Sequence, residues 1–273
     1  MKKIYDLDQY ADYLFQRELS KSTIDIYIRE AKCLLDFLQD RQITKEEIIS
    51  YKKTILGMNQ KTSTTNLKIV AVNSYLTYAG YSNYKIRTER IQKHRCLENV
   101  INMEEYKRIL DYAKDSNRFK YYFIIRVLVY TGIRISELNY LTVEVLPEGK
   151  FTVGNKGKIR DVYIPSNLAK ELNSYCRSQS ICSGVIFRGN CQKPISRIAV
   201  YKMLVHLADM AGVEKKKAHP HSFRHLFAVT YMKKYANLTE LADILGHASL
   251  ETTRIYTMTT AEEKRSRLEQ LGF

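Results

Sequence analysis

Apolar residues recur at helical spacing through the first eighty residues of the chain. The segments that show this spacing are 7–15, 22–38, 48–56 and 67–78. Ser22 is the expected N-cap of the second segment. Four amphipathic helices with short connections can bury their apolar faces only against one another, so residues 1–80 are expected to form a small helical bundle.

Helical periodicity fades after residue 80, and the chain becomes strongly basic. This stretch contains one acidic residue, Glu89, and five basic residues, which are Lys85, Arg87, Arg90, Lys93 and Arg95. We therefore expect an interdomain linker over 81–97, either as a solvated connection or as a strap that contacts a polyanion. The second domain is then 98–273.

The second domain is predicted to combine helices with one β-hairpin. Asn102 and Glu105 form a capping pattern at the start of apolar helical sequence. Apolar and polar residues alternate on both sides of a turn at 154–157, so 150–165 is expected to form a hairpin, and 185–187 is a candidate for a further short strand. Helical spacing is found again at 166–179, 196–211, 221–235, 237–245 and 249–257. The predicted fold class is mainly α with a small β-hairpin.

The charge balance of the chain indicates a polyanionic partner. The 273 residues include 44 Lys and Arg against 29 Asp and Glu, a formal net charge of +15, which is more than solubility requires. Nucleic acid is the favoured partner, because a protein that neutralises phosphates releases their condensed counterions. Anionic membrane surfaces and acidic proteins remain alternatives.

Two features that the sequence lacks narrow the class of protein. No apolar run reaches the length of a transmembrane helix and the N-terminus has no signal-peptide core, so we expect a cytoplasmic protein without membrane contact. The five cysteines form no C-x-x-C pair. Reduced thiols are therefore expected rather than disulfides or a zinc ribbon.

Three separated segments carry residues suited to chemistry. They read Thr131-Gly132-Ile133-Arg134-Ile135-Ser136-Glu137-Leu138, then His221-Ser222-Phe223-Arg224-His225, then Leu245-Gly246-His247 followed by Ile255-Tyr256-Thr257. In order and spacing, including the nine-residue step from His247 to Tyr256, this set resembles the tyrosine recombinases of the phage integrase family. The helical region before it resembles the core-binding, SAM-like DNA-binding domain of that family.

The resemblance implies a role for each residue of this set. Arg134 and Arg224 would be the paired phosphate-binding arginines. His221 and His247 would be the assisting histidines, and Tyr256 the nucleophile that forms a 3′-phosphotyrosyl bond with DNA.

Two further positions match the family's active site. Lys156, in the hairpin turn, matches the lysine that protonates the leaving 5′ oxygen, and Lys158 is its competitor because this turn is shorter than in many relatives. Glu137 matches an acidic position that supports the site.

The chemistry of strand exchange independently needs these residue types. A phenol that attacks a phosphodiester conserves the bond energy in a phosphotyrosyl ester. Two guanidiniums can hold the non-bridging oxygens, a lysine can protonate the leaving oxygen, and a histidine can accept the proton of the phenol. No metal ion, nucleotide or other cofactor is expected to take part.

Taken singly, these residues have ordinary structural interpretations. Arg134 and Glu137 would be a surface ion pair at i, i+3 spacing, and Gly246-His247 would be a helix C-cap. Tyr256 is one of 21 tyrosines, for which core packing or an interface contact is the default. The ordered set as a whole favours the catalytic interpretation.

The remaining histidines receive no role from the sequence. His94, His206 and His225 lack convincing metal spacing. Although His219, His221 and His225 lie close together, no structural metal is expected there, because a ligating His221 would be lost to catalysis.

The resemblance also implies an assembly, a two-domain clamp closing around duplex DNA. It implies a homotetramer on two DNA sites that exchanges strands through a Holliday junction, with the linker residues Lys85, Arg87 and Arg90 touching DNA. The segment 261–273 resembles the tail that docks on a neighbouring protomer, or else it ends in solvent. Because the chain starts directly at the bundle, without an arm-binding domain, it resembles Xer-type recombinases more than the larger integrases.

Two rival functions remain open on the sequence alone. A type IB topoisomerase uses the same phosphotyrosyl chemistry to relax DNA as a monomer, and a non-catalytic DNA-binding regulator would retain the fold. The residues of the three motifs and the helical N-terminal bundle favour a recombinase over the topoisomerase. The complete catalytic set argues against the regulator.

Overall fold

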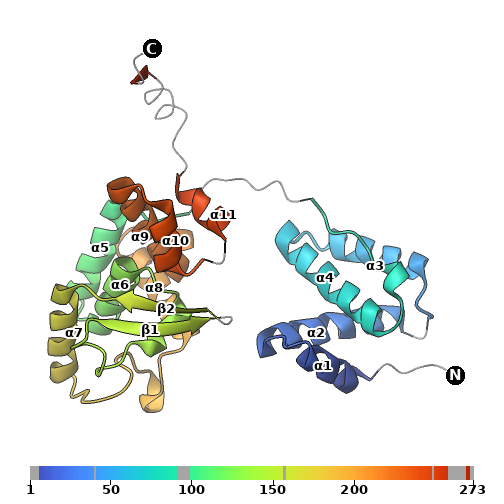
Figure 1. Cartoon of the computed structure of the whole chain (residues 1–273), viewed down its shortest axis with the longest axis horizontal. Coiled ribbons are helices and arrows are strands. Elements are labelled where there is room, and N and C mark those ends of the chain that lie inside the picture. Colours follow the sequence, from blue (N-terminus) through green and yellow to red (C-terminus); the bar gives the residue numbers. More distant parts are fainter. Residues whose placement is uncertain are drawn as a thin grey trace. The chain divides into compact units, whose positions relative to one another are not determined.

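A computed structural model describes residues 6–39, 41–90, 99–155, 158–247, 249–257 and 269–270 (Figure 1). The chain divides into two compact units, Met1–His94 and Arg95–Phe273. This boundary falls inside the segment 81–97. Each unit has a hydrophobic core of its own.

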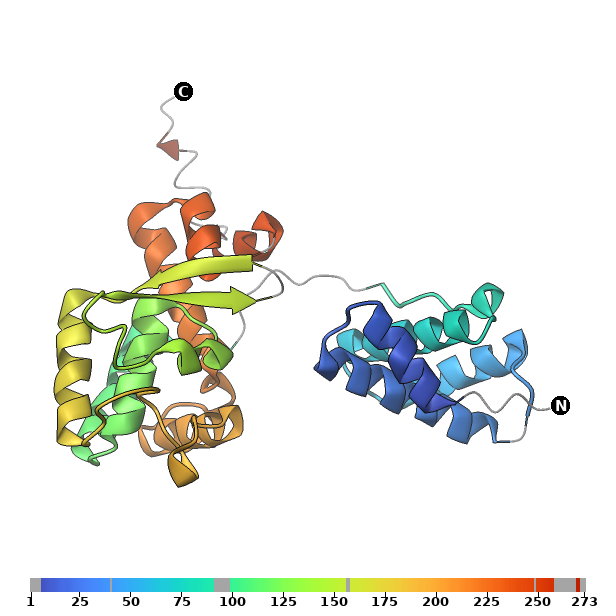
Figure 2. The ribbon, with the colours of Figure 1, turned by 60° about the horizontal axis from the view of Figure 1, so that its bottom comes forward.

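The first unit is a bundle of four helices, as the apolar spacing predicts (Figure 2). Its elements are α1 (Leu7–Gln16), α2 (Lys21–Leu38), α3 (Lys45–Gly57), α4 (Thr62–Tyr78) and the short 3₁₀ helix η1 (Ser82–Tyr84). Tyr10, Leu34, Ile55 and Tyr75 are completely buried, one from each helix. The four apolar faces therefore meet in a single core.

The second helix begins earlier than predicted, and Ser22 is not its cap. Ser20 is the N-cap of α2, and its side chain accepts a hydrogen bond from a backbone N–H of the first turn. Leu19 before the cap and Ile24 in the first turn both pack against the bundle core, which is the arrangement of a hydrophobic staple. A cap at Ser22 would put the charged Lys21 in place of Leu19 and remove this apolar packing.

Residues 85–90 lie along α4 and are hydrogen-bonded to two of its side chains. The amide of Asn73 donates to the carbonyl of Ile86 at 2.8 Å and accepts from its N–H at 2.9 Å, and Asn66 makes the same pair with Glu89 at 2.9 and 2.8 Å. The rise of α4 between the two asparagines is about 10.5 Å, which matches the length of three extended residues. The side chains of Asn66 and Asn73 thus form the backbone hydrogen bonds that a neighbouring strand would form with this segment in a β-sheet.

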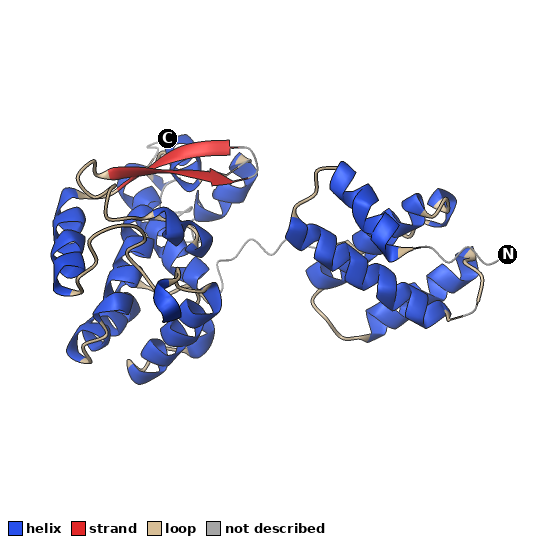
Figure 3. Ribbon diagram, turned by 90° about the horizontal axis from the view of Figure 1, so that it is seen from below, coloured by secondary structure: helices blue, strands red, loops and turns tan. Residues whose placement is uncertain are grey.

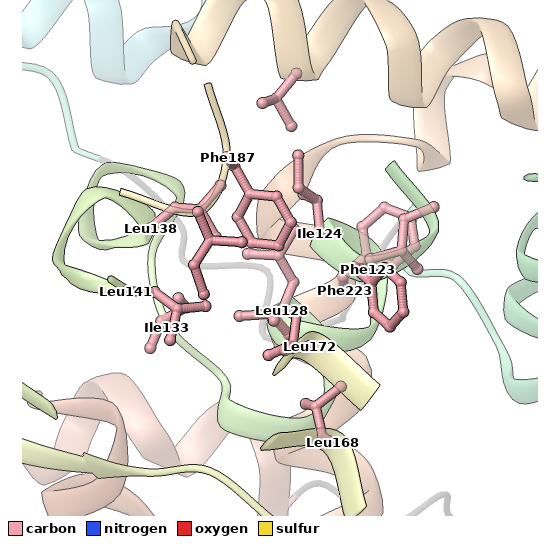
Figure 4. Packing of buried hydrophobic residues seen from close by; sticks show 14 of the residues in the cluster. Phe123, Ile124, Leu128, Ile133, Leu138, Leu141, Leu168, Leu172, Phe187 and Phe223 are labelled. Atoms are coloured by element: carbon pink, nitrogen blue, oxygen red, sulfur yellow. The ribbon is translucent and has the colours of Figure 1, made fainter. Parts of the chain in front are cut away.

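The second unit is built around α6, whose side chains are largely buried. Figure 3 shows that this unit is mainly helical, with two strands drawn in red. Its helices are α5 (Met103–Asp115), α6 (Phe119–Thr131), α7 (Ser166–Ser178), α8 (Arg197–Met210), α9 (Pro220–Tyr235), α10 (Leu238–Leu245) and α11 (Leu250–Thr253), with the 3₁₀ helices η2 (Ile135–Tyr140), η3 (Asn190–Gln192), η4 (Lys215–Lys217) and η5 (Arg254–Thr257). Phe123, Ile124 and Leu128 of α6 lie with Phe187 and Phe223 in the core (Figure 4). Helix α9 packs directly against α6.

The predicted capping box is present at the N-terminus of α5. The side chain of Asn102 accepts from the N–H of Glu105 at 2.8 Å, and the carboxylate of Glu105 accepts from the N–H of Asn102 at 2.9 Å. The N–H of Ile101 donates to the hydroxyl of Ser222 in α9 at 2.8 Å. The start of α5 is therefore joined to the helix that carries the second motif.

The predicted hairpin consists of β1 (Lys150–Asn155) and β2 (Lys158–Tyr163), paired antiparallel. Its buried face carries Phe151 and Val153 opposite Val162 and Arg160. The alternation of β2 therefore turns Arg160 toward the interior of the unit, on the same side as Val162. Strand β2 contacts α10.

Two expected elements differ from the prediction. The segment 185–187 is not a strand, because Val185 forms only an isolated bridge with Thr142 while Ile186 and Phe187 are buried in the core. The helix expected at 249–257 is a single α-helical turn, α11, continued by the 3₁₀ helix η5. Within the part of the chain that the structure describes, no helix has the length and apolar character needed to cross a bilayer.

Candidate active site

The three sequence motifs meet at the C-terminal end of α10. Three successive carbonyls there each accept a hydrogen bond from a different arginine, Ile244 from Arg160 at 2.9 Å, Leu245 from Arg224 at 2.6 Å and Gly246 from Arg134 at 3.2 Å. The last carbonyls of a helix have no partner within the helix and carry partial negative charge. The helix end therefore gathers three guanidiniums that come from separate parts of the chain.

Gly246 allows this arrangement. It is the C-cap of α10, which is the ordinary structural interpretation of Gly246-His247, and it has a left-handed backbone with φ of 60°. A Cβ atom at this position would lie 2.9 Å from Cδ of Arg160, so the arginine packs directly on the glycine. A larger residue would strain the backbone and displace Arg160.

Arg224 is the most deeply buried of the three arginines, with 3% of its surface exposed. Its second hydrogen bond goes to the carbonyl of Gly132, the C-cap of α6, at 2.7 Å. Burial, together with repulsion from Arg134, lowers the pKa of Arg224 to about 10, and it stays protonated at neutral pH. Arg224 thus joins the ends of two helices while holding a charge in the interior.

Glu137 is the carboxylate that partly balances this charge. It accepts from the N–H and the guanidinium of Arg134 at 2.8 and 3.0 Å, and from both ends of the Arg160 guanidinium at 3.0 and 2.8 Å. Burial alone would raise the pKa of Glu137, but the hydrogen bonds from Arg160 and Arg134 outweigh it and lower the pKa to about 2. Because Glu137 is only 3% exposed, its contact with Arg134 is not a surface ion pair.

The two histidines assigned by the resemblance lie beside these arginines. His247 follows Gly246, and its Nδ1 is hydrogen-bonded to the hydroxyl of Thr253 at 2.8 Å. Burial and the three arginines lower the pKa of His247 to about 4, so the ring is neutral at pH 7. His221 lies one turn before Arg224 on α9, and part of its side chain is open to solvent. The buried part of the ring, together with the charges of Arg224 and Arg134, lowers its pKa as well.

Tyr256 lies on η5 with 8% of its surface exposed. Its ring packs with Ala228, Leu241 and Leu245 in a small apolar cluster between α9 and α10. Its hydroxyl is hydrogen-bonded to Nδ1 of His225 at 2.6 Å. Burial raises the pKa of Tyr256 to about 12, and the nearby Arg224 counteracts part of that rise.

Some of the predicted site residues cannot be placed beside this cluster. Lys156 lies outside the described residues, and only the backbone of Lys158 is described, paired with Asn155. Lys85 and Arg87 belong, like Arg90, to the first unit and are exposed there.

The structure also adds two residues that the sequence did not single out. Arg160 binds Glu137 and α10, and its signal was the alternation of the hairpin, which puts it on the inward face with Val162. His225 contacts Tyr256, and its signal was its position one turn after His221 and next to Arg224. Both signals are local in sequence, but the roles of Arg160 and His225 depend on contacts with residues that are distant in sequence.

The cluster can bind an anion, and Tyr256 is near enough to Arg224 for the charge of the guanidinium to limit the rise in the pKa of the phenol. Three guanidiniums face one carboxylate, which leaves positive charge unbalanced in a largely buried position. A cavity of about 230 Å³ is lined by Arg134, Arg160, Gly246 and His247, among others. Within the described chain, no group of His, Cys, Asp and Glu is arranged to hold a metal ion. Phosphate is an anion whose oxygens match the paired hydrogen bonds of a guanidinium.

Comparison with known proteins shows the family to which the chain belongs. The residue pattern of the phage integrase family matches residues 99–263, and that of the phage integrase N-terminal SAM-like domain matches residues 7–81. A tyrosine recombinase of Pseudothermotoga lettingae is 28% identical over 284 residues, covering 97% of each chain. The tyrosine recombinase XerA of Pyrococcus furiosus is 29% identical over 273 residues, covering 97% of this chain and 93% of the relative.

One solved structure with a similar fold is a lambda integrase tetramer bound to a Holliday junction. It matches with a TM-score of 0.73 at 19% identity, covering 93% of this chain and 78% of that chain. The likeness therefore extends over both units of the fold.

Proposed function

The chain belongs to the phage integrase family and is a site-specific tyrosine recombinase, and we propose that it cuts and rejoins DNA strands through a covalent bond between Tyr256 and a 3′ phosphate. The observation that carries this proposal is the C-terminal end of α10. There Arg134 and Arg224 form a positively charged site, and the charge of Arg224 acts on the phenol of Tyr256.

The proposed reaction uses these groups as follows. Arg134 and Arg224 hold the non-bridging oxygens of the scissile phosphate, where negative charge builds up in the transition state. The Tyr256 oxygen attacks phosphorus as its proton passes to a histidine of the site, and the bond to the 5′ oxygen breaks as Lys156 protonates that oxygen. His221 and His247 donate hydrogen bonds to the phosphate. The ester keeps the bond energy, so a 5′ hydroxyl from a second DNA site can reverse the step and join a new strand through a Holliday junction.

A nicked suicide duplex tests this function. Its short 5′-hydroxyl fragment diffuses away after cleavage, so the covalent complex cannot religate and accumulates. The DNA site must come from sequence flanking the gene or from selection on a random pool. We expect a covalent adduct at Tyr256 in EDTA and without nucleotide, mapped by mass spectrometry of the DNA-linked peptide.

The first specific prediction concerns the salt dependence of DNA binding. Lys85, Arg87 and Arg90 are exposed on a segment that is already held in place by Asn66 and Asn73, so contact with DNA would require little further ordering. Replacing the three by Gln should lower the log–log salt slope by about 0.9 for each DNA phosphate that is no longer neutralised.

A matched control is the triple variant Lys107→Gln, Lys170→Gln and Arg177→Gln, which removes the same charge from exposed positions on α5 and α7. If both triples change the slope equally, the linker makes no special contact with DNA.

The second prediction identifies the residue that protonates the leaving group. A DNA substrate with a bridging 5′-phosphorothiolate has a leaving sulfur that hardly needs a proton. Lys156→Ala should therefore cleave this substrate at a rate close to that of the unsubstituted protein, while its rate on normal DNA falls about 10²-fold or more. Lys158→Ala should need no rescue, and the reverse pattern would transfer the role to Lys158.

The third prediction concerns assembly. We propose that the protein works as a homotetramer on paired sites in cytoplasmic DNA and that the segment 261–273, with Leu268 and Leu271, docks on a neighbouring protomer. A chain ending at Thr257 should keep its affinity for a duplex with one binding element but lose cooperative binding to two adjacent elements, which gel-shift titrations measure. Leu250→Ser, at an exposed leucine outside this segment, is the control. Undiminished cooperativity in the shortened chain would rule out the tail as the link.

A further inference from the structure

We propose that His225 is a catalytic residue that accepts the proton of Tyr256 when the phenol attacks DNA. The inference rests on the proposed function of Tyr256. It assigns to His225 a step that the sequence left between His221 and His247. Its basis is the contact between Nδ1 of His225 and the attacking oxygen, at 2.6 Å.

The position of His225 is set by α9. Arg224, which precedes it, is anchored by the ends of α6 and α10, so the rotation of α9 about its own axis is determined. This rotation turns the next side chain toward η5, where the ring centroids of His225 and Tyr256 are 5.5 Å apart. The pair therefore comes from the same framework that positions the phosphate-binding arginine.

The surroundings of His225 determine the direction of the hydrogen bond. The titratable and charged groups that face it are His221 and Arg224 from α9, His219 at the N-cap of α9, His247 after α10, and Tyr256 from η5. Burial, and then the neighbouring histidines and Arg224, lower the pKa of His225 to about 4. The imidazole is therefore neutral at pH 7. Because Tyr256 is then a neutral phenol, its O–H donates to Nδ1, which is the arrangement from which a proton can pass to the ring.

His247 and His221 have contacts that differ from those of His225. Nδ1 of His247 is bonded to Thr253, and the ring follows the carbonyl that holds Arg134. His221 is exposed one turn before Arg224 and is influenced by both phosphate-binding arginines. These positions suit hydrogen bonds to phosphate oxygens, whereas His225 is already in contact with the nucleophile.

Binding of DNA would make His225 a stronger base. In the free protein the charge of Arg224 opposes protonation of His225, and Tyr256 keeps its proton. A phosphate held by Arg134 and Arg224 brings negative charge that offsets this repulsion. Proton transfer is thereby favoured when a scissile phosphate is present.

The proton balance closes without any other reactant. As the oxygen of Tyr256 bonds to phosphorus, its O–H bond breaks and an N–H bond forms on His225. The bond from phosphorus to the 5′ oxygen breaks, and that oxygen takes its proton from Lys156. In the rejoining step both transfers reverse, and His225 returns the proton to Tyr256.

The test uses two substitutions in the full chain on the selected DNA site. His225→Ala removes the hydrogen-bond acceptor and the base. His225→Asn places an amide oxygen where Nδ1 lies, so it keeps an acceptor for the hydroxyl but cannot take up a proton. Thermal melting and DNA affinity check that each variant folds and binds.

We expect single-turnover cleavage by both variants to slow by about 10²-fold or more. We also expect their rates to rise steadily through alkaline pH, because hydroxide must then remove the phenol's proton, whereas the rate of the unsubstituted protein levels off. His221 and His247 are present in all three proteins, so the difference between the profiles isolates His225. A ring-fluorinated, more acidic tyrosine at position 256 should restore much of the lost rate.

Two results would overturn the proposal. If His225→Asn cleaves at the unsubstituted rate with the same pH profile, His225 only orients the phenol. If His225→Ala does so, the contact has no part in cleavage. Either result would leave the adduct at Tyr256 in the unsubstituted protein intact, whereas a missing adduct there would refute the proposed function itself.

Discussion

Phenylalanine at position 256 is expected to abolish covalent attachment to DNA while leaving DNA binding intact. The substitution keeps the ring and its packing with Ala228, Leu241 and Leu245, and it deletes the oxygen that attacks phosphorus. It also removes the hydrogen bond to His225, which should lower stability by only about 1 kcal/mol. Denaturing gels of suicide-substrate reactions measure the adduct, and gel shifts measure binding.

Tyr235→Phe is the matched control for this experiment. Tyr235 ends α9, is 56% exposed and loses the same hydroxyl on substitution. Its variant should form the adduct at the unsubstituted rate. An adduct that persists in Tyr256→Phe, or one that maps to another tyrosine, would refute the assignment of the nucleophile.

Alanine at position 134 is expected to slow cleavage by a factor equivalent to about 3 kcal/mol or more, on the order of a few hundred-fold. Arg134 is a quarter exposed, and its guanidinium reaches the cavity beside His247. Removing it leaves Glu137 paired with Arg160, so the fold should survive and DNA binding should fall much less than the rate. Single-turnover cleavage and thermal melting separate the two effects.

Two further arginine variants sharpen this prediction. Arg254 pairs with Glu251 on the surface at the same i, i+3 spacing as Arg134 with Glu137, so Arg254→Ala tests the removal of an ordinary pair and should change neither rate nor stability appreciably. Arg224→Ala should lower both, because it leaves the carbonyls of Gly132 and Leu245 buried without their donor. If Arg134→Ala cleaves as fast as Arg254→Ala, Arg134 does not stabilise the transition state.

Much of the fold follows from short-range patterns that the sequence displays directly. The capping box of Asn102 and Glu105, the hairpin at 150–165 and the C-cap at Gly246 each depend on a few consecutive residues whose backbone groups satisfy one another. The error at Ser22 shows where such patterns become ambiguous. Ser20 and Ser22 are equally good caps as residues, and the packing of Leu19 on the bundle core favours the first.

The sequence by itself determined the elements, the order of the motifs and the residue types from which the chemistry was assigned. The tertiary structure decided which partners these residues have. Arg160, Arg224 and Arg134 meet because three consecutive carbonyls at the end of α10 lack partners within their helix, and no local pattern reveals which side chains will reach them. In the same way, His225 and Tyr256 become partners only when α9 and η5 pack together. Helix spacing and capping are local properties of the chain, whereas the satisfaction of buried polar groups is a property of the whole fold.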